Sequence, residues 1–155
     1  MNFSSLLLPD RINLSLRSKK KDSVIKELVG MVKSGKDAEV MVSTLIKREQ
    51  LGSTGIGRGI AIPHCRSLLV DRLEIAIGRS VKGINFDAID KKPVYMVFLV
   101  IAPPQDPGNQ YLLTLGRIVQ LSKELVKKKL FMEPNTPQEF IKLIARIEKV
   151  TDRRK

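Results

Sequence analysis

The sequence has a single cysteine and a single histidine in 155 residues, and it contains no tryptophan. One cysteine excludes a disulfide within the chain, and one cysteine with one histidine is too few for a zinc cluster, so we expect no metal site. Aromatic residues make up only 5% of the chain. That scarcity argues against a surface that stacks nucleic-acid bases.

Long apolar runs are also missing, and none would cross a bilayer. The opening M-N-F-S-S-L-L-L-P-D lacks the basic flank and the apolar length of a signal peptide. We therefore expect a soluble, cytoplasmic protein that meets a membrane only indirectly, through a transporter. The length suits one domain, residues 1–155, with a sizeable core and without an internal repeat or linker.

Acidic residues are scarce beside basic ones: 16 Asp and Glu stand against 28 Lys and Arg, which gives a net charge of +12 and a pI near 10.0. Such a balance keeps a basic nucleic-acid-binding module open as an alternative function. The basic residues are dispersed, however, in runs such as 19–21, 127–129 and the tail at 153–155. Dispersed charge with few aromatic residues favours a solvated basic surface, so we expect no nucleic-acid partner.

What the sequence does contain is a glycine-rich segment, residues 47–67, that includes the only histidine. It reads K-R-E-Q-L-G-S-T-G-I-G-R-G-I-A-I-P-H-C-R-S, with glycines at positions 52, 55, 57 and 59. Glycine permits positive φ and brings backbone N–H groups close to a ligand, a geometry that commonly holds anions. The segment therefore indicates a phosphoryl group as ligand.

Two familiar nucleotide motifs do not fit this segment. The dinucleotide pattern G-x-G-x-x-G lacks its third glycine, and Gly57 is followed by Arg58 and Gly59 instead of the Lys and Ser/Thr of a P-loop. The chemistry of this segment therefore requires no nucleotide, and we expect no cofactor.

His64 can itself carry a phosphoryl group. Imidazole titrates near neutrality, so its neutral form can attack phosphorus at cellular pH and later pass the group on. Such a transfer needs charge stabilisation by arginine side chains and backbone N–H groups, and the arginines at positions 48, 58 and 66 are the candidates. Cys65 is interpreted as a small space-filling residue, because no second histidine is present to activate its thiol.

The run R-E-Q-L-G-S-T-G-I-G-R-G-I-A-I-P-H resembles the signature of the type 2 IIA domains of the bacterial phosphotransferase system (PTS). This fructose/mannitol group includes the nitrogen-regulatory IIA protein. The stretches L-L-L-P-D-R-I-N-L, G-R-S-V-K-G-I-N-F-D and T-P-Q-E-F are also similar, so the resemblance covers about residues 4–148. It implies that His64 accepts a phosphoryl group from phospho-HPr or a paralogue, as a phosphocarrier and not as a free-standing enzyme.

The resemblance also implies a set of site residues. We expect His64 to be the nucleophile and Arg48 the main charge stabiliser, and together they form the predicted catalytic pair. Many family members have a second histidine at the start of a later helix, where this chain has a tyrosine, which donates a hydrogen bond but carries no positive charge. The predicted phosphate-binding residues are Thr54, Gly55, Gly57, Arg58, Arg66 and Tyr111.

Two roles fit such a phosphocarrier: a stand-alone regulator of the nitrogen-related kind, or a sugar-specific (fructose/mannitol) component that passes the phosphoryl group to a IIB partner. Tyr111 and the lack of a fused carrier or transporter segment favour the regulator, because a regulator tolerates slow exchange and needs only a charge change at His64. A basic surface would suit an acidic regulatory target.

Strands that alternate with helices predict an α/β fold, a single layered domain. The resemblance implies that this domain has a central mixed β-sheet flanked by helices. Strands are expected at 12–16, 60–62, 73–78 and 94–101, with turns over 82–93. Helices are expected at 22–34, from a cap at Asp37 to about residue 48, after the proline-rich stretch 103–108, and from 136 onward. The side chains expected to face inward are Ala38, Val42, Leu45 and Ile46 on the second helix, and Leu112, Leu115, Val119 and Leu125 on the third.

Overall fold

A six-stranded mixed sheet lies at the centre of the structure, a computed structural model in which residues 2–154 are described. Its two long strands, β5 (Glu74–Ile84) and β6 (Val94–Ala102), run antiparallel; β6 is buried along almost its whole length, and β5 is buried over residues 75–80 and again at Ile84. The near-continuous apolar sequence of β6 is typical of a strand covered on both faces. The short strands are β1 (Ile12–Asn13), β2 (Gly55–Gly57), β3 (Ile60–Ala61) and β4 (His64–Arg66).

The strands follow the order β1-β5-β6-β3-β2, and β4 pairs with β6 as well. β1 lies parallel to β5, and both β3 and β4 lie parallel to β6, whereas β2 and β3 are antiparallel. The predicted α/β architecture with a central mixed sheet is therefore confirmed.

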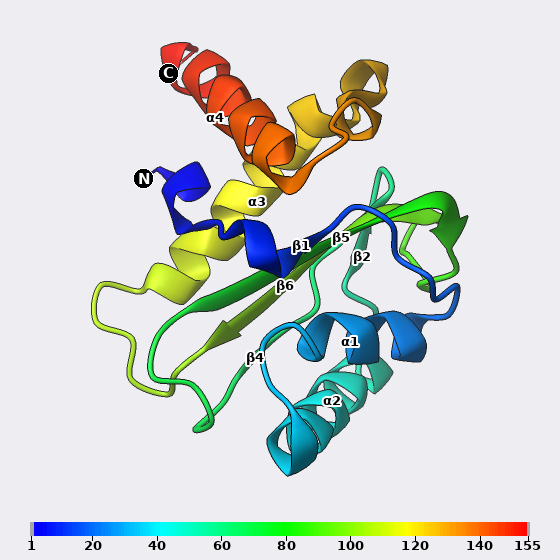
Figure 1. Cartoon of the computed structure of the whole chain (residues 1–155), viewed down its shortest axis with the longest axis vertical. Helices are drawn as coiled ribbons and strands as arrows, with labels where there is room; N and C mark the ends of the chain where they lie inside the picture. Colours follow the sequence, from blue (N-terminus) through cyan, green and yellow to red (C-terminus); the bar gives the residue numbers. More distant parts are fainter. Residues whose placement is uncertain (1, 155) are drawn as a thin grey trace.

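Helices cover both faces of this sheet (Figure 1). On one face lie α1 (Lys21–Val29) and α2 (Gly35–Gln50). On the other lie α3 (Gln110–Val126) and α4 (Pro137–Arg153), together with the 3-10 helices η1 (Phe3–Leu6), η2 (Pro9–Arg11) and η3 (Lys127–Met132). Among residues 2–154, no helix has the length and apolar character needed to cross a membrane.

Each face of the sheet has its own apolar cluster, because successive side chains of a strand point to opposite faces. Along β6, Met96, Phe98 and Val100 belong to the cluster under α3 and α4. Val97, Leu99 and Ile101 belong to the cluster under α1 and α2. The long central strands thus hold two helical layers together.

Several predicted boundaries were wrong. The first strand covers only Ile12–Asn13, and β5 continues to Ile84, through part of the predicted turn, because Ile84 still pairs with Val94. The first helix ends at Val29. The second begins at Gly35 after Ser34, so Asp37 lies in its first turn and is not its cap.

The predicted inward face of α3 was also wrong at two positions. Leu112 is 58% exposed and Val119 is 41% exposed, Leu115 is half-buried, and only Leu125 is fully buried. The buried stripe of α3 is shifted by one residue from the predicted one. Its residues recur every three or four positions, at Tyr111, Thr114, Ile118, Leu121 and Leu125. On α2, Leu45 is buried as expected, while Ala38, Val42 and Ile46 are half-buried beside the buried Met41.

Candidate functional site

His64 is the first residue of β4, directly after the buried Pro63. The amide of Val100 donates to the carbonyl of Pro63 at 3.0 Å, and His64 is the Cα partner of Val100 in the parallel pairing with β6. A rigid central strand therefore fixes the backbone that carries the imidazole.

One nitrogen of the His64 ring is already engaged. Nδ1 lies 2.6 Å from the carbonyl oxygen of Ile62. A carbonyl only accepts, so Nδ1 must be the donor in this bond and the neutral ring has its lone pair on Nε2. The side chain is half-buried. The free lone pair is thus the one available for attack on phosphorus.

The imidazole lines a hollow of about 290 Å³ between the glycine-rich segment and α3. Its polar lining comes from Arg48, Ser53 and Thr54 beside His64, and its remaining wall comes from Ile56, Ile62, Leu115, Gly116 and Val119. Arg48 and Thr54, both predicted site residues, therefore meet His64 at one cavity.

Arg48 lies in the last turn of α2, which is where a cation also favours the helix dipole. Its Nη1 donates to the carbonyl oxygen of Gly52 at 2.8 Å. This bond uses one of five guanidinium N–H donors, and the others remain for an anion in the hollow.

Thr54 is 4% exposed, and its hydroxyl has no hydrogen-bond partner among residues 2–154. A buried hydroxyl without a partner is costly, and a phosphoryl oxygen in the hollow would supply one. The amide of Thr54 is not free for this purpose, because it donates to Oε1 of Glu49 at 3.0 Å.

Glu49 is a site residue that the sequence analysis missed. Its side chain is buried, accepts the Thr54 amide and lies 3.4 Å from Nζ of Lys21. The carboxylate holds the loop after α2 against the helix end, and so it positions Thr54. No sequence signal marks this burial, because it depends on the loop folding back over the last turn of the helix.

Tyr111 lies next to His64, with 6.0 Å between the two ring centroids. Burial raises the pKa of the Tyr111 hydroxyl to about 12, so it stays neutral at cellular pH. The Arg66 guanidinium lies over this ring at 4.6 Å and donates to the carbonyl oxygen of Pro103 at 3.1 Å. Arg66 is therefore placed one ring away from the imidazole.

Asp106 was also missed. Its two carboxylate oxygens accept from the amides of Gln110 and Tyr111 at the start of α3. A carboxylate at a helix start is a recognisable signal, because it satisfies free N–H groups there. In this chain it fixes the ring of Tyr111 beside His64.

The glycines form a hairpin, which accounts for their number. Gly57 and Gly59 adopt φ of 94° and 82°, and Arg58 between them adopts 59°. A Cβ on Gly55 would lie 2.8 Å from Cα of Ala88, so only glycine fits there. Arg58, at the tip, lines a different hollow from His64. The expected contact of Gly55, Gly57 and Arg58 with a phosphoryl group stays a prediction.

Comparison with known sequences gives one matching family. Residues 5–147 match the family described as phosphoenolpyruvate-dependent sugar phosphotransferase system, EIIA 2. The fructose-specific EIIABC component of the PTS of Bacillus subtilis (strain 168) is 35% identical over 153 residues, which are 96% of this chain but 24% of that protein. This chain thus spans about a quarter of that relative's length.

A second relative matches over most of its own length. The nitrogen regulatory protein of Bradyrhizobium diazoefficiens is 31% identical over 126 residues, or 80% of this chain and 82% of that protein. Among solved structures, the nitrogen regulatory protein IIA-Ntr of Neisseria meningitidis superposes with a TM-score of 0.81 at 25% identity, covering 91% of this chain and 97% of that one. This chain therefore resembles both fructose-specific components and nitrogen regulatory proteins in sequence, and a nitrogen regulatory protein in fold.

Proposed function

Because this chain belongs to the EIIA type 2 family of the phosphoenolpyruvate-dependent sugar phosphotransferase system and is thus a phosphocarrier, we propose that it carries the phosphoryl group on His64. The observation that carries this proposal is the bond from Nδ1 to the carbonyl of Ile62 at 2.6 Å. That bond selects the tautomer in which Nε2 is unprotonated and ready to react.

In the proposed step, the lone pair of Nε2 attacks the phosphorus of a donor phosphohistidine. The new N–P bond forms as the donor's N–P bond breaks, and the donor imidazole keeps the electron pair. No base is needed, since Nε2 holds no proton. The Ile62 carbonyl, bonded to Nδ1–H, stabilises the positive charge that develops on the ring.

Two further groups act on the phosphoryl oxygens. The remaining donors of Arg48 stabilise their negative charge, and the Thr54 hydroxyl, which has no partner among residues 2–154, donates a hydrogen bond to one of them. Tyr111 packs beside the imidazole as a neutral neighbour. Arg66 lies over the Tyr111 ring and holds it in place.

The partners follow from the family. The donor is phospho-HPr or a paralogue in the cytoplasm, and the recipient is a IIB domain or a regulatory target. Relatives of both kinds resemble this chain. The neutral Tyr111 hydroxyl, which adds no cation beside His64, favours the regulatory role, because slow exchange is compatible with a change in partner affinity.

A phosphorylation assay tests the acceptor. The protein is incubated with enzyme I, HPr and labelled phosphoenolpyruvate, and we expect one acid-labile phosphate per chain. His64→Ala should take up none, whereas Lys36→Ala, at an exposed position on α2, should be labelled fully. Acid-labile phosphate on folded His64→Ala would refute the assignment.

A further inference from the structure

A second hollow lies at the tip of the β2–β3 hairpin, where the hairpin approaches η3 (Figure 1). It measures about 370 Å³ and shares no lining residue with the hollow at His64. Three cations, Arg58, Lys92 and Lys129, line it together with the rings of Tyr95 and Phe131. The phosphocarrier mechanism uses none of these side chains.

The positive charge of this hollow is only partly balanced within the described chain, by one carboxylate against three cations. Its one carboxylate, Asp90, accepts from the amides of Arg58 and Lys92 at 3.1 and 3.0 Å, and these backbone bonds hold the pKa of Asp90 below its ordinary value. Within residues 2–154, neither arginine nor lysine side chains of the hollow form an ion pair. An adjoining hollow of about 270 Å³ shares Lys92 and adds Lys82 and Lys91.

The backbone around the hollow is strained in a consistent way. Arg58, Lys91, Lys128 and Lys129 adopt φ of 59°, 61°, 53° and 55°, the left-handed conformation that glycine or asparagine would adopt at lower cost. These four are basic residues, and they account for most of the non-glycine residues with positive φ in the described chain. Of these four, Arg58 and Lys129 line the hollow and Lys91 lines the adjoining one.

Two glycines pack against the aromatic part of the hollow. The rings of Tyr95 and Phe131 have centroids 5.9 Å apart. A Cβ on Gly59 or Gly83 would lie 3.2 Å from a ring carbon of Tyr95, and both glycines have positive φ. The glycines thus let the backbone approach the Tyr95 ring closely, and the ring itself is half-buried.

We propose that this hollow binds a nucleoside polyphosphate, with the phosphates on Arg58, Lys92 and Lys129 and the base beside Tyr95. Arginine and lysine bind phosphate oxygens through charge-assisted hydrogen bonds. An aromatic ring can stack against any of the nucleic-acid bases. The volume lies within the range of small-ligand sites. The site is independent of phosphorylation at His64, so the two proposals stand or fall separately.

Titration calorimetry at physiological salt tests the proposal, since the chain has no tryptophan to report binding. The probes are ADP, GDP, pyrophosphate and adenosine. We expect saturable binding of ADP or GDP, at least tenfold tighter than of pyrophosphate or adenosine. Absence of saturable nucleotide binding would overturn the proposal, and equal affinity for pyrophosphate would overturn the role of the aromatic rings.

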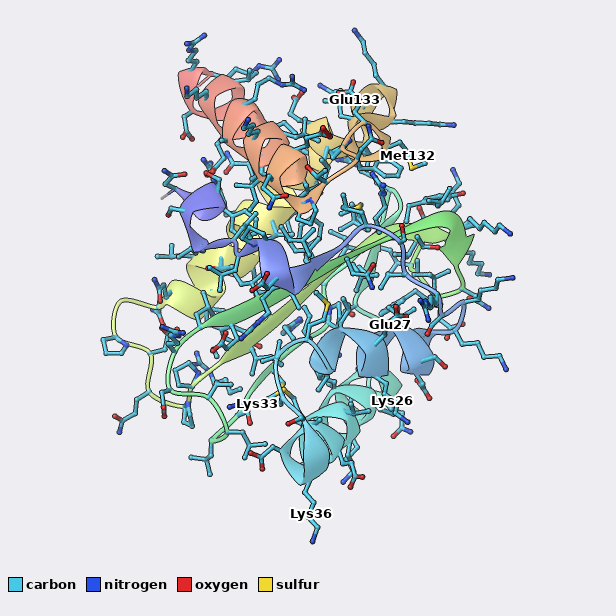
Figure 2. All side chains as sticks on the ribbon, in the orientation of Figure 1. Lys26, Glu27, Lys33, Lys36, Met132 and Glu133 are labelled. Atoms are coloured by element: carbon cyan, nitrogen blue, oxygen red, sulfur yellow. The ribbon has the colours of Figure 1, made fainter. Side chains whose placement is uncertain are left out.

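Two variants locate the site. Arg58→Asn removes the cation but tolerates positive φ, and it should lower nucleotide affinity at least tenfold while leaving the melting temperature unchanged or higher. Lys36→Gln removes the same charge from α2, whose Lys36 side chain projects into solvent far from Met132 at the end of η3 (Figure 2), and affinity should not change. Equal losses in both variants would mean general attraction to a basic surface and would overturn the site.

Discussion

At the scale of single residues, Arg48 is the cation that shares a hollow with His64. We expect Arg48→Ala to slow phosphoryl transfer by an amount worth ~2 to 4 kcal/mol of transition-state stabilisation. The melting temperature should hardly change, because the bond to Gly52 is exposed. Rapid-quench transfer from phospho-HPr measures the rate, with Arg48→Lys as the matched control. Unchanged rates in folded Arg48→Ala would move the role to Arg66, whose guanidinium lies over the Tyr111 ring beside His64.

Cys65 gives a prediction about alkaline pH. Burial raises the pKa of the thiol from 9.0 to about 11 in the folded protein. The unfolded chain loses this proton first, so the contribution of Cys65 to stability is complete below pH 9 and is lost as the pH rises toward 11. Urea unfolding at pH 8 and pH 10.5 should show a steeper loss in the wild type than in Cys65→Ala, by about 1 to 2 kcal/mol. Parallel losses would contradict the burial of the thiol.

At the scale of elements, Glu148 joins three parts of the chain. Its carboxylate on α4 accepts from the amides of Phe3 and Ser4 at 2.8 Å each and pairs with Arg117 of α3 at 3.0 Å. Both side chains of the pair are about 5% exposed. Glu148→Ala leaves a buried guanidinium and two amides without this acceptor, so we expect a loss of about 3 to 5 kcal/mol in unfolding free energy.

The exposed pair of Arg146 and Glu133 provides the comparison for that prediction. Its atoms are 3.6 Å apart and its side chains are 64% and 59% exposed. Arg146→Ala should cost less than about 1 kcal/mol in the same urea titration. A similar loss of unfolding free energy in both variants would show that burial of the Glu148 pair does not increase its contribution to stability.

Elements with local signals could be predicted from the sequence. Helix α4 begins as expected, because Thr136 accepts from the amide of Glu139 and Pro137 occupies the first helical position. The end of β5 could not be predicted, since Lys82 and Gly83 have turn composition and only the pairing of Ile84 with Val94 keeps them in the strand. Long-range pairing therefore decided what local preference did not.

The candidate site also has residues that could be predicted from the sequence and residues that could not. A continuous motif places Arg48, Thr54 and His64 at one hollow, so the sequence was sufficient to bring them together. It was not sufficient for Arg58, which a hairpin carries to another hollow, nor for Glu49, whose burial depends on the loop that covers it. The spacing of residues along the chain does not reveal the direction in which a turn sends its tip.

At the scale of the whole molecule, the proposed regulatory role makes a prediction about growth. We expect deletion of the gene to leave growth on fructose and mannitol intact and to change a regulated response, which wild type restores and His64→Ala does not. Growth curves on single sugars provide the measurement. Selective loss of growth on one such sugar, restored by wild type but not by His64→Ala, would establish the sugar-specific role instead.

Strand β4 places two adjacent residues on opposite sides of the sheet. His64 borders the α3 side, whereas Cys65 lies in the cluster under α1 and α2. Cys65 is only 8% exposed, so local opening of the α1–α2 layer speeds its reaction with a thiol reagent, and the rate at this only cysteine of the sequence reports such opening. Comparing the rates of the phosphorylated and unphosphorylated protein would reveal whether a charge added on one side of the sheet changes the motion of the layer on the other.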